Sequence, residues 1–343
     1  MPSSTSSSRP RPPGGFLLAL LLAAVVEGGL WQRPGVVRFA ARYTPPGPDG
    51  DALITDAALT RIPTDETPLL LLGSSQVREG LDCAVFEARL PKRPCLNLAI
   101  SGGSPTDMLY IQRRLDPRLR RRTVVVAIFP RVLHKPVKTG FVDGETVGLV
   151  LGRSEWRAVA AQEWRDVFFG LLQFMLPSLR YKDSLRAAWD VVGADPRAAW
   201  ELRMPSQPNR LLIDAAPQPA RYYQLRRGIV DPDIHITAFT PVQEAALLRL
   251  LDNEAALGGR AIVVDFPTRP GFETTLAAEV AAQYRGLVAR LRDRKDVVFV
   301  PAERLGPLTE ADFLDFSHLA ESGRAQVSER LAAIVAAEAP PPR

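Results

Sequence analysis

The chain has 343 residues, a net charge of +5, 46% apolar residues and 24% charged residues. These values are typical of a packed globular protein of one large or two ordinary domains. The two cysteines, Cys83 and Cys95, are too few for a disulfide framework. Each fits a small buried apolar position, and a single bridge between them stays open but is not favoured. Without a Cys-x-x-Cys motif or a histidine cluster, a structural zinc site is not expected.

Six arginines gather between Arg113 and Arg122, just before a predicted strand. One interpretation is a nucleic-acid stripe. A solvated helix end explains the cluster more simply, because basic residues are favoured near helix C-termini. We therefore expect no nucleic-acid partner.

The N-terminal sequence predicts a membrane anchor. Residues 1–15 are rich in Ser and Pro and carry Arg9 and Arg11, which indicates a disordered cytoplasmic tail. An apolar run follows and extends to Trp31, a typical interfacial anchor. No small-x-small cleavage site follows, so an uncleaved signal anchor over residues 16–32 is favoured over a cleaved signal peptide or a buried helix. The positive-inside rule then exports everything beyond the anchor.

Strands and helices alternate after a proline-dotted stem at residues 33–66. Apolar and β-branched runs predict strands, and amphipathic segments between them predict helices. The expected order is strand 69–72, helix 77–90, strand 95–100, helix 106–115 and strand 123–129. Such alternation predicts a parallel sheet in an α/β domain.

A helical insertion is expected at about residues 140–258, where the alternation breaks. Its helices are predicted at 156–176 and 185–192. The apolar stretch 168–176 either covers the sheet, which is favoured, or rests on a membrane. The alternation resumes with strand 261–266, helix 273–292, strand 297–300 and a last helix near 320–336. One domain thus spans residues 67–336, and residues 337–343 form a tail.

The first predicted strand ends in Gly73-Ser74-Ser75, and a helix follows. This arrangement puts a serine hydroxyl at the carboxyl edge of the sheet, where open α/β sheets bind ligands. Serine is also a preferred helix cap. The motif alone leaves a capping serine and a nucleophile equally favoured.

A histidine suited to activate a serine stands before the last predicted helix. His318 follows Asp315 by three residues, a spacing that lets the carboxylate orient the imidazole while one ring nitrogen remains free. The alternative is that Asp315 or the serine next to His318 only caps the helix. Of the two other histidines, His134 could line the pocket and His235 is interpreted as structural.

Three segments resemble the first, second and fifth blocks of the SGNH/GDSL hydrolases: Gly73-Ser-Ser75, Asn97-Leu-Ala-Ile-Ser-Gly102-Gly-Ser and Asp315-Phe-Ser-His318. The resemblance implies a three-layer α/β/α sandwich with a flavodoxin-like sheet, and no cofactor. It implies Ser75 as nucleophile, His318 as base and Asp315 as its partner, with backbone N–H groups of Ser75 and Gly102 binding the oxyanion. We also expect Asn97 and Arg78 to bind substrate. An α/β-hydrolase elbow would need glycine in place of Val77.

The third block departs from the family. Its Gly-x-Asn-Asp motif supplies a further oxyanion donor, but here the third strand is followed by Phe129-Pro130-Arg131. Pro130 has no N–H or side-chain donor, and the loss of one such donor typically costs about 2.7–4 kcal/mol. Either Arg131 substitutes as an oxyanion donor, or the oxyanion hole is weak, or the site is degenerate. Arg131 could equally be a surface residue.

With its anchor and insertion, the chain resembles the membrane-anchored SGNH proteins that work beside membrane-bound O-acyltransferases. Those of alginate O-acetylation and of teichoic acid D-alanine transfer are examples. The resemblance covers residues 67–336. It implies an O-acyltransferase or esterase at the periplasmic or extracytoplasmic side of a bacterial inner membrane. An acylated donor, a polysaccharide acceptor and an acyltransferase partner are the expected partners. The alternative is a catalytically weak or inactive scaffold that binds a glycan or that partner.

Overall fold

The computed structural model describes residues 68–91, 93–100, 102–115, 122–134 and 239–338, with a few positions between 22 and 33. The described positions of the expected anchor, among them Leu22, Val25 and Leu30, are helical. The rest of the anchor, the stem and most of the expected insertion lie outside the described residues. Within the described part of the chain, no helix is both long and apolar enough to cross a membrane.

Five parallel strands form one sheet, so the predicted α/β class is confirmed. The strand order is β2-β1-β3-β4-β5, the doubly wound order whose ligands bind where the strand sequence reverses, between β1 and β3. All the carboxyl ends therefore lie at one edge of the sheet. The strands are β1 (Leu69–Leu72), β2 (Cys95–Asn97), β3 (Thr123–Ile128), β4 (Arg260–Asp265) and β5 (Val297–Val300).

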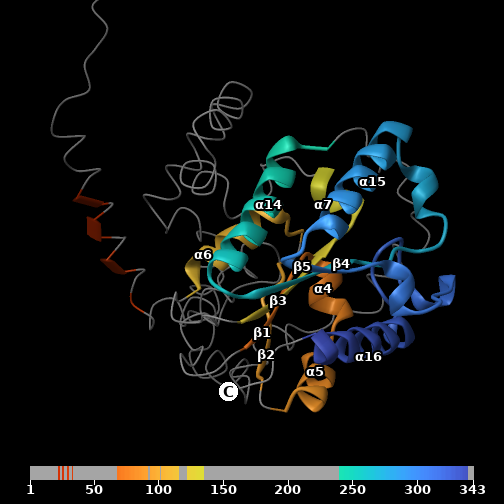
Figure 1. Ribbon diagram of the computed structural model, residues 1–343, viewed down its shortest axis with the longest axis horizontal. Helices are drawn as coiled ribbons and strands as arrows, with labels where there is room; N and C mark the ends of the chain where they lie inside the picture. The colour runs from red at the N-terminus through yellow and green to blue at the C-terminus, as the bar shows by residue number, and fades with distance from the viewer. Residues whose placement is uncertain are drawn as a thin grey trace, which may run out of the picture.

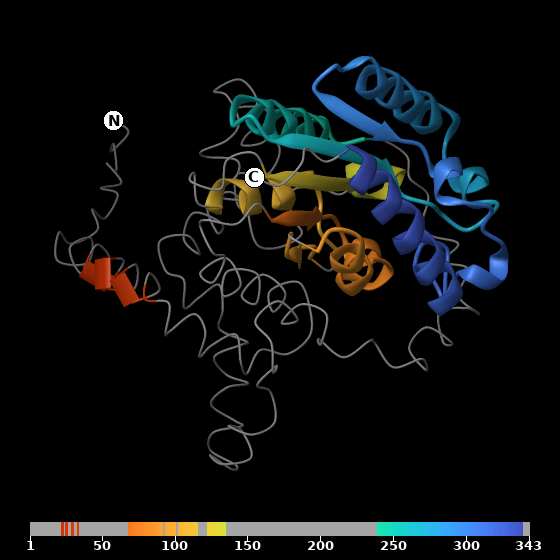
Figure 2. The same ribbon diagram turned by 60° about the horizontal axis from the view of Figure 1, so that its bottom comes forward.

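Helices cover both faces of the sheet, which gives three layers (Figures 1 and 2). One face carries α6 (Pro105–Arg114), α14 (Pro241–Ala256) and α15 (Ala278–Asp293). The other carries α4 (Ser75–Gly80), α5 (Cys83–Arg89) and α16 (Glu321–Glu338). The short helices α7 (Pro130–His134), η2 (Phe272–Thr275), η3 (Ala302–Leu305) and η4 (Glu310–Asp312) join these elements.

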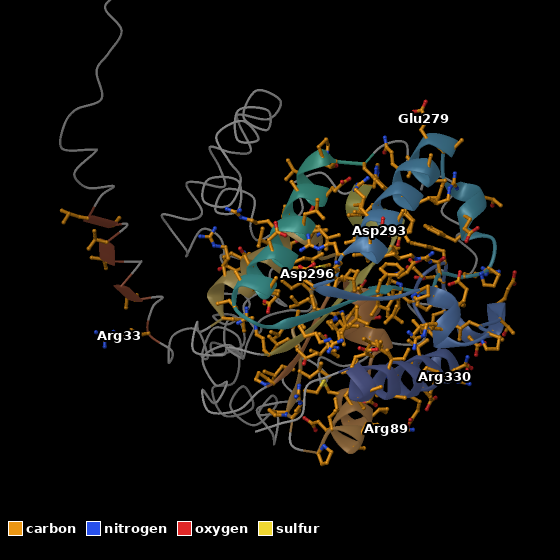
Figure 3. The ribbon with its side chains drawn as sticks, viewed as in Figure 1. Arg33, Arg89, Glu279, Asp293, Asp296 and Arg330 are labelled. Carbon is orange, nitrogen blue, oxygen red and sulfur yellow. A yellow bond between two sulfur atoms is a disulfide. The ribbon has the colours of Figure 1, made fainter. Side chains whose placement is uncertain are left out.

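Each face of the sheet has its own apolar core because side chains alternate along every strand. Leu70 and Leu72 pack in the core under α6 and α14, whereas Leu69 and Leu71 pack in the core under α4 and α16. All four leucines are fully buried, as a central parallel strand requires. At roughly 1.5–3 kcal/mol for each buried leucine, β1 is a major contributor to the stability of both layers. Charged side chains such as Arg89, Glu279 and Arg330 point outward (Figure 3).

Two predicted helices are each broken in two. The helix expected at 77–90 ends at Gly80, and α5 begins anew after Asp82, whose side chain accepts a hydrogen bond from the Ala84 N–H (3.0 Å). The helix expected at 273–292 is η2 followed by α15, with extended backbone at Leu276 and Ala277 between them. Capping by Asp82 and the extended backbone at Leu276 and Ala277 therefore interrupt two helices that the apolar periodicity predicted as continuous.

The helix α14 falls within the range expected for the insertion, yet it belongs to the sandwich. It packs on α6 and β4, and its Leu247 and Leu250 are fully buried in the core. The chain leaves the described region after α7 and returns beside it. The Thr240 N–H donates to the Leu133 carbonyl (3.0 Å), and the Thr240 hydroxyl donates to the His134 carbonyl (3.1 Å).

A disulfide joins Cys83 to Cys95, with 5.3 Å between their Cα atoms. It links the first residue of α5 to the first residue of β2, and both cysteines are buried. The pairing that composition left open, and that we did not favour, is thus present. The bridge ties the α5 layer to the edge of the sheet.

Candidate active site

The turn from β1 into α4 depends on a glycine. A Cβ placed on Gly73 would lie 2.3 Å from Val77 Cγ2, so a side chain here would push α4 away from the strand. Ser74 is the N-cap of α4, and its hydroxyl accepts a hydrogen bond from the Gln76 N–H (3.4 Å). Ser75 is the first residue of the helix. The two serines therefore divide the roles that the sequence left open, because Ser74 caps the helix and leaves the Ser75 hydroxyl available.

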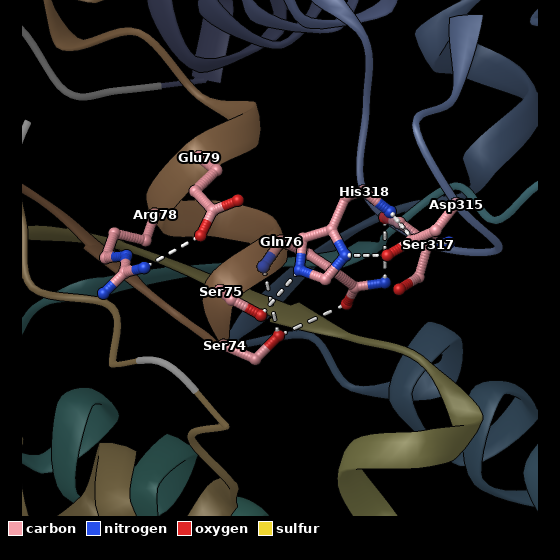
Figure 4. Close-up of polar contacts among 8 residues, drawn as sticks. All are labelled: Ser74, Ser75, Gln76, Arg78, Glu79, Asp315, Ser317 and His318. Atoms are coloured by element: carbon pink, nitrogen blue, oxygen red, sulfur yellow. Dashed lines mark hydrogen bonds and ion pairs between the residues drawn. The ribbon is translucent and has the colours of Figure 1, made fainter. Parts of the chain in front are cut away.

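Ser75, His318 and Asp315 form a continuous hydrogen-bonded chain (Figure 4). The Ser75 Oγ lies 2.8 Å from His318 Nε2, and His318 Nδ1 lies 2.7 Å from Asp315 Oδ2. Both distances are within the 2.6–3.2 Å expected of a nucleophile and its base and of the base and its orienting group. The structure therefore brings together the three residues that the sequence predicted as catalytic.

The ionisation of Asp315 sets the direction of the hydrogen bonds that join Ser75, His318 and Asp315. Burial alone would raise the pKa of Asp315, but the hydrogen bond and charge of His318, with the backbone N–H groups of Ser317 and His318, together lower it. Asp315 Oδ1 accepts from both N–H groups at 2.8 Å. Asp315 is thus a carboxylate, so His318 Nδ1 donates to it. His318 Nε2 is then the acceptor for the Ser75 hydroxyl.

The loop that carries His318 is fixed by the start of α16. The Leu314 N–H donates to the His318 carbonyl (2.7 Å), and the Ala320 N–H donates to the Asp312 carbonyl (2.8 Å). A Cβ on Gly323 would lie 2.4 Å from that same Asp312 carbonyl oxygen, so the loop and helix can touch only because this residue is glycine. His318 is therefore held in position by the backbone contacts of its own loop and by the close approach of α16.

The segment after β2, which contains Gly102 and Gly103, lies against the Gly73–Ser75 turn. The Ile100 N–H donates to the Gly73 carbonyl (3.1 Å), and a Cβ on Gly103 would lie 2.8 Å from that carbonyl oxygen. Gly102 has φ +72°, a left-handed conformation that favours glycine. The expected oxyanion donors, Ser75 and Gly102, thus lie in the segments that follow the adjoining ends of β1 and β2. Their roles as donors remain predictions.

Arg131 packs against the loop that carries His318. It lies in α7, directly after β3, and its guanidinium carbon is 4.9 Å from the centre of the Phe316 ring. Phe316 in turn stacks on Phe272, with ring centres 5.6 Å apart. Phe316 precedes His318 by two residues, so Arg131 is a neighbour of the site and not an isolated surface residue. Its predicted donation to the oxyanion remains a prediction.

Asn97 does not fit its predicted substrate-binding role. The side chain is 1% exposed, and its Nδ2 donates to the Val77 and Arg78 carbonyls (3.1 and 3.3 Å). Its Oδ1 accepts from the Ala99 N–H (3.2 Å). Because these polar atoms bond to the backbone, Asn97 instead fastens α4 to the end of β2.

Arg78 also lies differently from the prediction. Its side chain is largely buried and bonds to Glu79 (2.8 Å). It points away from Ser75 and His318 (Figure 4). This placement gives no support to contact with a substrate held at Ser75.

Gln76 is a site residue that the sequence did not indicate. It is 2% exposed, and its Nε2 donates to the Ser317 carbonyl (3.2 Å). A glutamine in the first turn of a helix is usually exposed, so no sequence signal marked it. His134, at the end of α7, is not part of the hydrogen-bonded chain, and His235 lies outside the described residues. In the described part of the chain, no three His, Cys, Asp or Glu residues are grouped so as to hold a metal.

Comparison with known proteins gives no family assignment. No family model matches the chain, and no curated protein matches it. Among solved structures, the chain is similar to one described as "a putative platelet activating factor from Streptococcus pneumonia". That likeness has a TM-score of 0.35 and 12% identity, and it covers 93% of this chain and 99% of the other.

Proposed function

We propose that this chain is a serine acyl-transfer enzyme, an esterase or O-acyltransferase of SGNH type, that acts on an envelope or secreted polysaccharide. The observation that supports this proposal is the hydrogen-bonded chain from the Ser75 hydroxyl through His318 to the Asp315 carboxylate. A serine hydroxyl is a weak nucleophile at neutral pH, and a base within hydrogen-bond reach activates it.

The geometry suggests the following steps. His318 Nε2 takes the proton of Ser75 as Oγ bonds to the ester carbonyl carbon, and the carbonyl electrons move to oxygen. Backbone N–H groups of Ser75 and Gly102 receive this oxyanion. The tetrahedral intermediate then collapses, the ester C–O bond breaks, and His318 returns its proton to the departing alkoxide. Positioned proton transfer of this kind typically contributes about 10²–10⁴ in rate.

The second half of the reaction regenerates the serine. A sugar hydroxyl, or water in an esterase, gives its proton to His318 and attacks the acyl carbon. The bond to Ser75 Oγ breaks and the serine recovers its proton. The Asp315 carboxylate stabilises the imidazolium that forms in each half-reaction. No step requires a cofactor.

The proposed setting is the outer side of a bacterial inner membrane, reached through the N-terminal anchor. The resemblance to envelope-acylating proteins supports a polysaccharide acceptor and a membrane-bound O-acyltransferase as partner. The Cys83–Cys95 disulfide also supports export, because structural disulfides persist in oxidising compartments.

A non-catalytic scaffold is the second candidate, and Pro130 is the observation that favours it. Pro130 occupies the first position of α7, where the resembling family places an oxyanion-binding asparagine. A site without that donor could hold a glycan or an acyltransferase without performing chemistry.

Labelling with a fluorophosphonate, which reacts with activated serines, separates the two candidates. We expect the purified protein to be labelled and Ser75→Ala to abolish labelling. Ser328→Ala is a matched control: it also removes a bonded hydroxyl, which accepts from the Asp82 N–H (3.0 Å), but on α16 away from the site. It should keep the labelling. Two results together would favour the scaffold. The folded wild-type protein would not be labelled, and cells carrying Ser75→Ala would keep normal polysaccharide acylation.

A further inference from the structure

Gln76 links the helix that carries the nucleophile to the loop that carries the base. Besides the Ser75–His318 contact, its Nε2 makes a buried hydrogen bond to the Ser317 carbonyl (3.2 Å) across 241 residues of sequence. Ser317 and Gln76 are each 2% exposed. The bond therefore joins two elements inside the protein, where water cannot replace either partner.

The orientation of the Gln76 amide is fixed by the Ser317 carbonyl, which can only accept a hydrogen bond, and the Ser74 hydroxyl complements it. The Ser74 hydroxyl donates to Gln76 Oε1 (3.3 Å), which leaves Nε2 facing the Ser317 carbonyl. In the opposite orientation, the Gln76 oxygen would face the carbonyl oxygen of Ser317, and two acceptors would meet. The capping serine and the amide thus form one unit with a single favourable arrangement.

This bond holds one end of a particular peptide group. The peptide between Ser317 and His318 offers its carbonyl to Gln76 Nε2 and its N–H to Asp315 Oδ1 (2.8 Å). Both polar groups of that peptide are therefore fixed, one from α4 and one from within the loop. The direction in which the His318 side chain leaves the backbone depends on this peptide plane.

We propose that Gln76 is a positioning residue, which acts through His318 by holding the Ser317–His318 peptide so that Nε2 stays within reach of the Ser75 hydroxyl. This inference rests on the proposed acyl-transfer function. Gln76 need not touch the substrate. Misplacement of a reacting group by about 1 Å can reduce a rate about 10²-fold, so a small shift of the loop has a measurable effect.

The test is a double-mutant cycle on the rate of fluorophosphonate labelling. Gln76→Met keeps the length of the side chain and removes the donor, and we expect labelling to slow about 10–100-fold. In a His318→Ala background the same substitution should change the rate less than about twofold, because the group it positions is gone. Gln76→Glu, which keeps the shape but replaces the amide donor, tests the same point if Gln76→Met does not fold.

Gln112→Met is the matched control. Gln112 is also a buried glutamine whose Nε2 donates to a carbonyl of a distant element, but it lies in α6, away from the site. Its Nε2 donates to the Leu250 carbonyl (2.8 Å) and to Glu254 Oε1 (2.7 Å), both in α14. Its substitution should lower the melting temperature and leave the labelling rate of the folded protein unchanged.

Three results would overturn the inference. One is wild-type labelling that neither Gln76 variant slows. Another is a Gln76→Met effect of the same size with and without His318, which would mark a purely structural role. If the folded wild type is not labelled at all, the proposed function itself fails, and the inference fails with it.

Discussion

Asp315 accepts two hydrogen bonds from His318, one from the ring and one from the backbone. The bond to the ring fixes which ring nitrogen carries the proton. The bond to the backbone N–H fixes the position from which the His318 side chain extends. A carboxylate has two oxygens, so one residue can perform both tasks. The same side chain thus orients the proposed base, His318, and shapes the loop that carries it.

Asp315→Asn should separate these two tasks. Asparagine can still accept the backbone bonds through one oxygen, but its NH₂ group cannot accept from His318 Nδ1, so the favoured tautomer places the proton on Nε2. We expect fluorophosphonate labelling to slow roughly 10³–10⁴-fold with only a small change in melting temperature. Asp312→Asn, in the same loop but bonded to Thr309 and Ser322, is the control and should stay within a few-fold of wild type. Equal rates for the two variants would contradict the assigned role.

Gly73→Ala should destabilise the fold at the turn into α4. The added Cβ would lie 2.3 Å from Val77 Cγ2, and relief of this clash requires α4, which carries Ser75, to move. We expect a loss of about 1–3 kcal/mol in the free energy of unfolding, measured by urea denaturation. Gly286→Ala is the control, because its Cβ would meet only Arg290 at 3.7 Å within α15. Alanine there should stabilise the helix by about 0.5–1 kcal/mol. Equal losses of unfolding free energy in both variants would contradict the specific requirement for glycine at position 73.

Reduction of the Cys83–Cys95 bridge should lower the free energy of unfolding and leave fluorophosphonate labelling in place. The bridge closes a loop with a sequence separation of 12, for which loop-closure entropy gives roughly 2–3 kcal/mol. We expect a reductant to lower the urea midpoint of the wild type and to leave that of the Cys83→Ala/Cys95→Ala protein unchanged. Both forms should still be labelled at low temperature. A midpoint that does not respond to reductant would mean that no bridge forms in solution.

Asp265 should make stability depend on pH in the direction opposite to most carboxylates. Burial raises its pKa to about 6, with Glu303 and Glu273 adding to the rise, while the hydrogen bond from Tyr284 (2.5 Å) and the charge of Arg292 oppose it. Between about pH 4 and pH 6 the folded state holds a proton that the unfolded state has lost, so stability falls as pH rises through this window.

Asp265→Asn provides the measurement. Asparagine keeps an acceptor for the Tyr284 hydroxyl and cannot ionise. Relative to wild type, the variant should gain roughly 2–3 kcal/mol in unfolding free energy between pH 4 and pH 6, and the gain should level off above pH 6. Denaturation curves that keep a constant separation from pH 4 to pH 7 would contradict the prediction.

The sequence predicted the sheet well because its strands are short and uninterrupted. The observed bounds of β1 and β5 match those expected, because each is a short apolar run bounded by residues that interrupt it. Helix bounds were less accurate. The signals for the break between α4 and α5 were present in Gly80 and Asp82, but the periodicity of Val77–Leu90 concealed them. The role of α14 could not be read from its own sequence, because packing on α6 decides it.

The site could be predicted only in part. The convergence of Ser75, Asp315 and His318 was predicted because their motifs are short and chemically distinctive. Asn97 was assigned a different role and Gln76 was missed, because the direction of an amide side chain depends on the backbone groups that surround it. The disulfide was likewise undecided, since the proximity of Cys83 and Cys95 follows from the packing of α5 on the sheet edge.

The bonds from Thr240 to Leu133 and His134 have a consequence for the architecture of the chain. The described chain stops at His134 and resumes at Phe239, and these bonds hold the two ends together at the end of α7. A linker of a few residues could therefore join His134 to Phe239 without distorting any strand of the sheet. Residues 135–238 could then be shortened, lengthened or exchanged while the edge of the sheet that carries Ser75 and His318 stays in place.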